Sequence, residues 1–210
     1  MTPYLFGIIK LKKPAWLKYL LLNTKEILPS EYEGIEYLES TGYQYIDLDV
    51  IGRSITNFDL KLATTDENPS VIRRILGGYT SSNRFELAIH NERGMFFNYY
   101  NSSIYSDFVP TLNEPIIVKK KANKISYNDT ESSLSTATFS SEKSSYLFAS
   151  NRSATSKFIG RIYYCKVWQN GDLVRNMVPC IRKSDNVAGM YDFVSKELFV
   201  NKGSSDFITP

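Results

Sequence analysis

The chain has 210 residues, of which 42% are hydrophobic and 22% charged, and its formal net charge is +3. This balance is typical of a soluble globular protein, and a chain of this length can bury a core without disulfides or metals. One His and two Cys cannot supply the four ligands of a Cys/His zinc site, and no stretch reaches the ~18 apolar residues that a membrane-spanning helix needs.

The N-terminal segment differs from the rest of the chain in charge. Five Lys and Glu26 give residues 1–29 a side-chain charge of +4, whereas the remaining 20 basic and 21 acidic residues give −1. We therefore interpret residues 1–30 as an arm and residues 31–210 as one domain. Because the basic excess lies on the arm, no nucleic-acid partner is expected for the domain.

A short helix is predicted over residues 15–23 of the arm. Pro14 suits a first helical turn, and three Leu recur at i, i+3 and i+4 spacing. A signal peptide is disfavoured because Lys18 interrupts the apolar stretch and no small-residue cleavage site follows. The arm would dock either on its own domain or on another subunit. The residues expected to dock are Tyr4, Leu5, Phe6, Ile8, Trp16, Leu17, Leu20 and Leu21.

Period-2 alternation, broken by Gly, Asn and Pro turns, predicts strands from residue 35 onward. Asn170-Gly171 is the strongest hairpin signal, and the Ser-rich residues 126–156 are interpreted as polar loops and edge strands of the same domain. These features predict an all-β fold, a two-sheet antiparallel sandwich. The predicted strands are residues 35–39, 43–49, 55–62, 72–79, 84–90, 95–100, 115–121, 124–128, 144–150, 158–169, 173–179, 188–193 and 198–200.

The segment 161–168 is predicted to be a central strand, because both of its faces are rich in apolar side chains. Cys165 is interpreted as a buried free thiol. A disulfide bridge to Cys180 across the hairpin remains an alternative. Strict alternation puts Tyr163, Cys165 and Val167 on one face and Ile162, Tyr164 and Trp168 on the other.

Isolated polar residues receive structural interpretations. His90 is interpreted as a hairpin-end histidine, since nothing marks a nucleophile beside it. The run 119–121 of three Lys is interpreted as a solvated strand edge that blocks aggregation. Asp47 and Asp49 are expected on the solvent side of an outer strand, with a calcium site as the alternative.

A mixture of aromatic and polar side chains suggests a carbohydrate site. Sugars are apolar on their ring faces and polar at their rims, so aromatic rings bind the faces and Asn, Asp or Arg bind the hydroxyl groups. The same aromatic residues could instead form the core of a sandwich. The candidate carbohydrate-binding residues are Tyr79, Arg84, Asn98, Tyr99 and Asn101.

Several stretches share a pattern with one group of known domains: residues 34–47, 146–151, 160–163, 169–175, 178–180 and 189–192. There the chain resembles the laminin-G-like, concanavalin A-like jelly-roll domains of tailed-phage virion proteins and bacterial surface proteins. The resemblance covers about residues 34–205 and leaves the arm outside. It implies a jelly roll that binds or builds rather than catalyses.

The expected function is therefore a non-enzymatic phage virion structural or adhesion protein on the particle surface. Its residues 1–29 would dock on a neighbouring virion protein, and a homo-oligomer is expected. The alternatives are a glycan-binding module for host surface polysaccharide and a location on a bacterial cell surface. A glucanase-like hydrolase is disfavoured, because the two carboxylate pairs at residues 31/33 and 47/49 each lack the third carboxylate of the pattern that such enzymes of this fold carry on one strand. No cofactor or metal is expected, since no phosphate-binding glycine pattern occurs.

Overall fold

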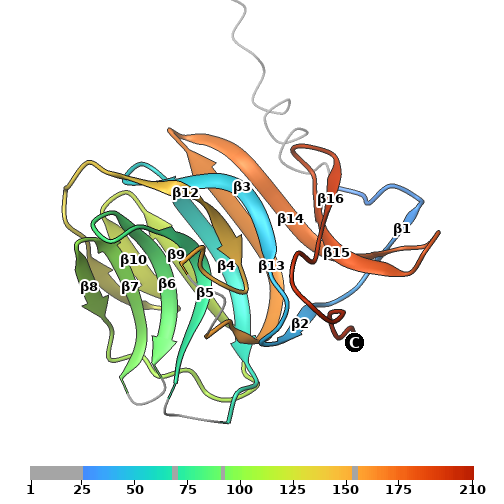
Figure 1. The fold of residues 1–210 in the computed structure, drawn as a ribbon, viewed down its shortest axis with the longest axis horizontal. Helices are drawn as coiled ribbons and strands as arrows, with labels where there is room; N and C mark the ends of the chain where they lie inside the picture. Colours follow the sequence, from blue (N-terminus) through green and yellow to red (C-terminus); the bar gives the residue numbers. More distant parts are fainter. Residues whose placement is uncertain (1–25, 68–70, 91–92, 153–155) are drawn as a thin grey trace, which may run out of the picture.

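The computed structural model describes residues 26–67, 71–90, 93–152 and 156–210 (Figure 1). All regular secondary structure in these residues is β-strand. The described residues contain no helix that is long and apolar enough to cross a membrane. The strands are β1 (Tyr32–Gly34), β2 (Leu38–Thr41), β3 (Ile46–Arg53), β4 (Asn57–Thr64), β5 (Ile72–Tyr79), β6 (Arg84–His90), β7 (Gly94–Tyr100), β8 (Ser102–Tyr105), β9 (Ile116–Lys121), β10 (Lys124–Tyr127), β11 (Thr130–Ser133), β12 (Ser140–Leu147), β13 (Ile159–Gln169), β14 (Asp172–Arg182), β15 (Val187–Asp192) and β16 (Glu197–Val200).

These strands form two antiparallel sheets. The ten-stranded sheet A has the order β11-β10-β9-β4-β13-β14-β15-β16, with β1 paired to β14 and β2 to β13. The six-stranded sheet B has the order β3-β12-β5-β6-β7-β8. The prediction of an all-β fold with two antiparallel sheets is thus confirmed.

The two sheets pack face to face through aromatic and branched side chains. Phe58 of β4 meets Phe85 and Phe97 of sheet B edge-on, with ring centroids 6.1 and 5.8 Å apart. All three rings belong to one buried cluster to which both sheets contribute. Edge-to-face rings each add roughly 1 kcal/mol beyond the burial of their area. The aromatic wealth of the sequence therefore serves largely as core.

Sheet A contains tight hairpins, and the one at Asn170-Gly171 confirms the prediction. β13 and β14 are joined by Asn170 and Gly171, both with positive φ (52° and 90°), as a tight hairpin turn of this sequence requires. β9 and β10 pair across Ala122, whose φ is 51°. By contrast, the turn around Gly42 does not close a hairpin: β2 before it pairs in sheet A, and β3 after it belongs to sheet B.

The faces predicted for Ile162 and Tyr163 of β13 are wrong, because a β-bulge breaks the alternation, whereas those of the four predicted residues after them are confirmed. Ile162 pairs with Leu62 of β4, but Tyr164 pairs with the adjacent Lys61, which leaves Tyr163 as the extra residue. Such an insertion re-aims every side chain beyond it. The residues directed into the core are consequently Ile162, Cys165 and Val167. Those left outside the core cluster are Tyr163, Tyr164 and Trp168.

Three further expectations are corrected. β9 is no edge, since it lies between β10 and β4, and Lys120 on it is only 1% exposed. Cys165 and Cys180 are both buried free thiols, so the alternative of a disulfide bridge is wrong. Within the Ser-rich region, β11 is an edge strand as expected, but β12 lies inside sheet B.

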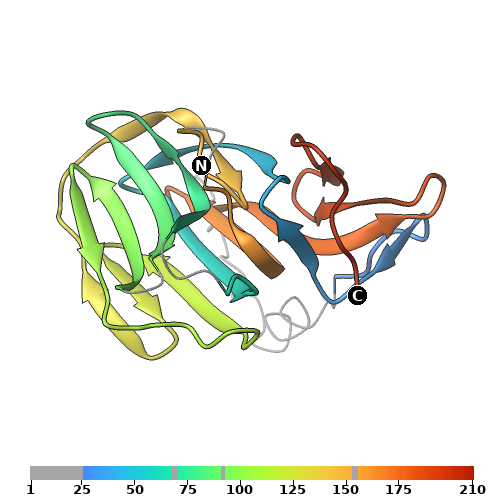
Figure 2. The ribbon, with the colours of Figure 1, turned by 60° about the horizontal axis from the view of Figure 1, so that its bottom comes forward.

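A wing extends from the body of the sandwich (Figures 1 and 2). β14 pairs with β13 at its start and with β15 and β1 at its end. β15 and β1 therefore lie away from sheet B and form the wing with the end of β14. The segment before β1 is tied to this wing. The amide of Asn176 donates to Glu26, and Lys183 donates to the carbonyl of Ser30 at 2.8 Å. The predicted helix and the eight predicted docking residues of the arm lie outside the described residues.

Candidate functional site

Polar and aromatic side chains gather on the outer face of sheet B, the face turned away from the core. Along β6 and β7, Leu87 and Phe97 belong to the core cluster, so their neighbours Glu86 and Asn98 lie on the opposite face. One unbroken row of directly paired residues crosses all six strands on that side. The row consists of Asp47, Tyr146, Gly77, Glu86, Asn98 and Ser103.

The middle of this row is a buried polar network. Glu86 is 1% exposed; it accepts a hydrogen bond from the amide of Asn98 at 2.7 Å and pairs with the Nε of Arg74 at 3.3 Å. The hydroxyl of Ser103 in turn donates to Asn98 at 2.5 Å. A carboxylate so far from water needs these partners, because an unpaired buried charge is very costly. The network therefore holds its side chains in place on the outer face.

Tyr79, next to the row on β5, has two guanidinium groups near its ring. The central carbon of Arg84 is 5.4 Å from its ring centroid, and that of Arg152 is 4.1 Å away. The buried Nε of Arg84 has no hydrogen-bond partner among the described residues. Neither arginine forms an ion pair with a carboxylate in the described part of the chain. Both guanidinium groups thus keep hydrogen-bonding capacity.

At the β3 end of the row two tyrosines stack. The rings of Tyr45 and Tyr146 are 4.7 Å apart and inclined by only 28°. Burial, together with the negative charge of Asp47 and the neighbouring Tyr45, raises the pKa of Tyr146, so its hydroxyl stays protonated at neutral pH. A cavity of about 220 Å³ opens beside them. Its lining residues are Tyr45, Tyr146, Ala149, Ser150, Asn151, Arg152 and Lys157.

The structure brings three of the five predicted carbohydrate-binding residues to this face. Tyr79 and Arg84 are direct partners across β5 and β6, and Asn98 lies in the row, although it is 5% exposed and already bonded. Tyr99 points the other way: it is 2% exposed, and its hydroxyl donates to the carbonyl of Ser54. Asn101 is exposed in the turn before β8. Tyr99 therefore offers no ring face to a ligand.

Sequence reasoning missed most of the other members of the face. Glu86 lies two residues after Arg84 on one strand, so the period of 2 could have placed it beside the predicted residues. Tyr45, Tyr146 and Arg152 give no such signal, because they come from distant segments, namely the residue before β3, the strand β12 and the connection after β12. Only the pairing of Tyr146 with Gly77, and the isolated bridge between Asn151 and Gly78, bring them to β5.

The outer face of sheet A carries a second aromatic group, but its charges are paired with one another. Arg161 lies 4.7 Å from the ring centroid of Tyr37 and forms an ion pair with Glu39 at 2.7 Å. The hydroxyl of Tyr164 donates to Asp59, which also faces Lys119 at 3.4 Å. A cavity of about 360 Å³ lies beside Trp168 on this sheet. Because these polar groups already have partners within the chain, the outer face of sheet A offers fewer free hydrogen-bonding groups to a ligand than the outer face of sheet B does.

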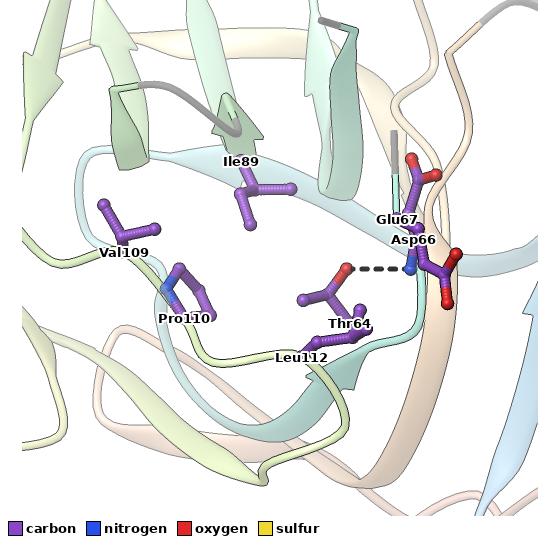
Figure 3. Close-up of a pocket in the computed structure, with 7 residues that line it drawn as sticks. All are labelled: Thr64, Asp66, Glu67, Ile89, Val109, Pro110 and Leu112. Atoms are coloured by element: carbon purple, nitrogen blue, oxygen red, sulfur yellow. Dashed lines mark hydrogen bonds between the residues drawn. The ribbon is translucent and has the colours of Figure 1, made fainter. Parts of the chain in front are cut away.

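A further cavity, of about 250 Å³, lies at one end of the sandwich, where Ile89, Val109 and Leu112 lie across from the carboxylates of Asp66 and Glu67 (Figure 3). Asp66 is held by the Nε of Arg73 at 2.5 Å. The walls of this cavity are largely apolar. It lacks the mixture of aromatic rings and hydrogen-bonding groups found on the outer face of sheet B.

Comparisons with known proteins assign no family. No protein-family model matches the chain, and no curated protein matches it. Within the described residues, no group of three His, Cys, Asp or Glu side chains could hold a metal ion. Asp47 and Asp49, for which calcium was the alternative, lie on β3 at the edge of sheet B. The site is therefore judged on its own geometry.

Proposed function

We propose that the protein is a non-catalytic carbohydrate-binding module and that a sugar chain lies across the outer face of sheet B. The observation that carries this proposal is the single row through Tyr146, Gly77 and Glu86, flanked by Tyr79 with its two arginines. It combines the rings of Tyr79 and Tyr146, for the apolar sides of sugars, with two guanidinium groups that keep donors for the sugar hydroxyls.

The spacing of carboxylates supports binding rather than hydrolysis. Asp47 and Glu86 are the two acids of the row, and they are three strands apart, on β3 and β6. At about 4.8 Å between strands, this places them roughly 14 Å apart. Glycosidases of either stereochemistry keep their two carboxylates within about 9.5 Å of each other. Glu86 is also occupied by Arg74 and Asn98.

The proposal is tested by screening the purified chain against a broad panel of bacterial and plant polysaccharides. Any ligand found is then titrated against Tyr79→Ala and Tyr146→Ala variants, with Tyr163→Ala on sheet A as the matched control. We expect each of the first two changes to weaken binding by about tenfold, because an aromatic stacking partner contributes roughly 1–2 kcal/mol. A blank panel, or loss of binding only in Tyr163→Ala, would contradict the proposal.

A second proposal concerns the assembly to which this module belongs. The sequence resemblance and the basic, apolar residues 1–29 support a jelly-roll adhesion protein displayed on a phage particle and fastened by its arm. Deletion of residues 1–25 is expected to leave the domain folded and to abolish incorporation into particles. Normal incorporation of the truncated protein would refute the anchoring role.

A further inference from the structure

We propose that the sugar chain bound by the outer face of sheet B carries carboxylate groups, and that Arg84 and Arg152 bind one of them. This inference rests on the proposed function and names the class of its ligand. The central carbons of the two guanidinium groups lie 5.4 and 4.1 Å from the centroid of the same Tyr79 ring, so the two charges are less than about 10 Å apart.

The two positive charges repel each other, and because their separation is no more than about 10 Å, close to the Debye length, salt screens this repulsion only in part. No carboxylate of the described residues forms an ion pair with either of them. Elsewhere on the same face the pattern is different: Arg74 is paired with Glu86. The arrangement around Tyr79 therefore lacks an anion.

A guanidinium group has a planar fork of N–H donors that matches the two oxygens of a carboxylate. The side chain of Arg152 is exposed and that of Arg84 is partly exposed, so a ligand carboxylate can approach both guanidinium groups. Lys157, whose Nζ lies 5.7 Å from the ring centroid of Tyr45, adds a further positive charge beside the cavity next to the row.

The distances along the sheet suit a chain of sugars rather than a single acid. Tyr146 on β12 and Glu86 on β6 are two strands apart, which is about 10 Å. A carboxylate bound by Arg84 and Arg152 would leave the rest of the chain free to run along the sheet toward the stacked pair Tyr45 and Tyr146. This separates the roles of the residues: the arginines select the charge, and the tyrosines contact the sugar rings.

The test uses the full chain and four acidic polymers, namely polygalacturonate, alginate, hyaluronate and polysialic acid. Each is compared by calorimetry with the same polymer after methyl esterification, which removes the charge and keeps the sugar. The variants are Arg84→Gln and Arg152→Gln, and Lys121→Gln is the control, because Lys121 is exposed on sheet A. We expect at least one acid to bind at least tenfold more tightly than its ester, each arginine change to cost about tenfold, and Lys121→Gln to have no effect.

Three results would overturn the inference. Equal binding of an acid and its ester, or binding of neutral glycans only, would refute the carboxylate and leave the proposed function standing. Failure of all four acids together with a blank general panel would refute both. Binding of dextran sulfate or of a single-stranded oligothymidylate as tight as that of the best acid would show a general affinity for polyanions, and the carboxylate would not be the recognised group.

Discussion

The Nζ of Lys120 lies 2.8 Å from the carbonyl oxygen of Ser54, on the core side of sheet A. The lysine is 1% exposed, and its remaining near contacts are the side-chain oxygen of Asn57 at 3.5 Å and the ring of Tyr99. Burial lowers the pKa of Lys120 to about 8. A buried cation held by neutral partners opposes folding while it is charged.

The first prediction concerns pH. In the unfolded chain Lys120 titrates near its ordinary pKa of 10.5, so between about pH 8 and 10.5 the unfolded state binds more protons than the folded state. This residue's contribution to stability is therefore lowest below pH 8 and rises with pH across that window, by about 3 kcal/mol in all. Lys120→Met should raise the free energy of unfolding at pH 7 by about 2 kcal/mol and remove this dependence. Tyr99 still donates to Ser54, so the carbonyl keeps a partner.

Urea denaturation of the wild type, Lys120→Met and Lys121→Met at pH 7 and pH 9.5 checks this prediction. Lys121 is exposed and should behave as wild type when replaced. A Lys120→Met protein that is less stable than the wild type at pH 7 would show that the buried cation has a stabilising role.

The second prediction concerns the pair of Glu86 and Arg74. Glu86→Gln leaves Arg74 without its carboxylate in a site where the arginine side chain is only 12% exposed. We expect a loss of about 3 kcal/mol. The double variant Glu86→Gln with Arg74→Met should lose less than the single Glu86→Gln variant, because no unpaired charge remains. Additive losses in chemical denaturation would rule out coupling between the two.

The third prediction concerns the glycine in the centre of the row. A Cβ on Gly77 would lie 2.1 Å from the carbonyl oxygen of Phe85, and its φ of 152° is one that other residues rarely adopt. Gly77→Ala should therefore cost more than about 3 kcal/mol. Gly171→Ala is the matched control: its φ is 90°, but nothing lies within 4 Å, so only the backbone strain of about 1 kcal/mol is expected. Equal melting temperatures for the two variants would contradict the steric argument.

The fourth prediction concerns the thiols. Burial raises the pKa of Cys165 to about 12 and that of Cys180 to about 11, and the reactive form of a thiol is the thiolate. Neither should react with an aromatic disulfide reagent at pH 8 in the native protein, and both should react in denaturant. One thiol reacting rapidly under native conditions would mean that the wing around Cys180 opens locally.

The fifth prediction concerns the boundary of the domain. Glu26 contacts Asn176, and Ser30 contacts Lys183, so we expect the folded unit to begin before residue 31. A chain starting at residue 26 should melt within about 2 °C of one starting at residue 1. A chain starting at residue 31 should be less stable by roughly 1 kcal/mol, because it lacks both contacts. Identical melting of the two truncated chains would place the boundary at residue 31.

Much of the fold could be read from local patterns. Alternation and turn residues located most strands within a few positions, and the turn at Asn170 and Gly171 was recognised because its geometry depends on those two residues alone. The candidate site was recognised in part. Tyr79 and Arg84 lie on the two strands of one hairpin, so their positions in the sequence were enough to predict that they are neighbours. The direction of the Tyr99 side chain depended on which face of β7 meets the opposite sheet.

The sequence by itself determined the class of the protein: an all-β chain, rich in aromatic residues, with a basic segment before a nearly neutral domain. Only the tertiary structure decided which side chains share a face. The bulge at Tyr163 put Ile162 in the core and Tyr163 outside it, Lys120 is buried, and the pairing of β12 with β5 brought Tyr146 into line with Glu86. The physical reason is that strand pairing between distant segments follows from packing of the whole core, and no local pattern of residues specifies it.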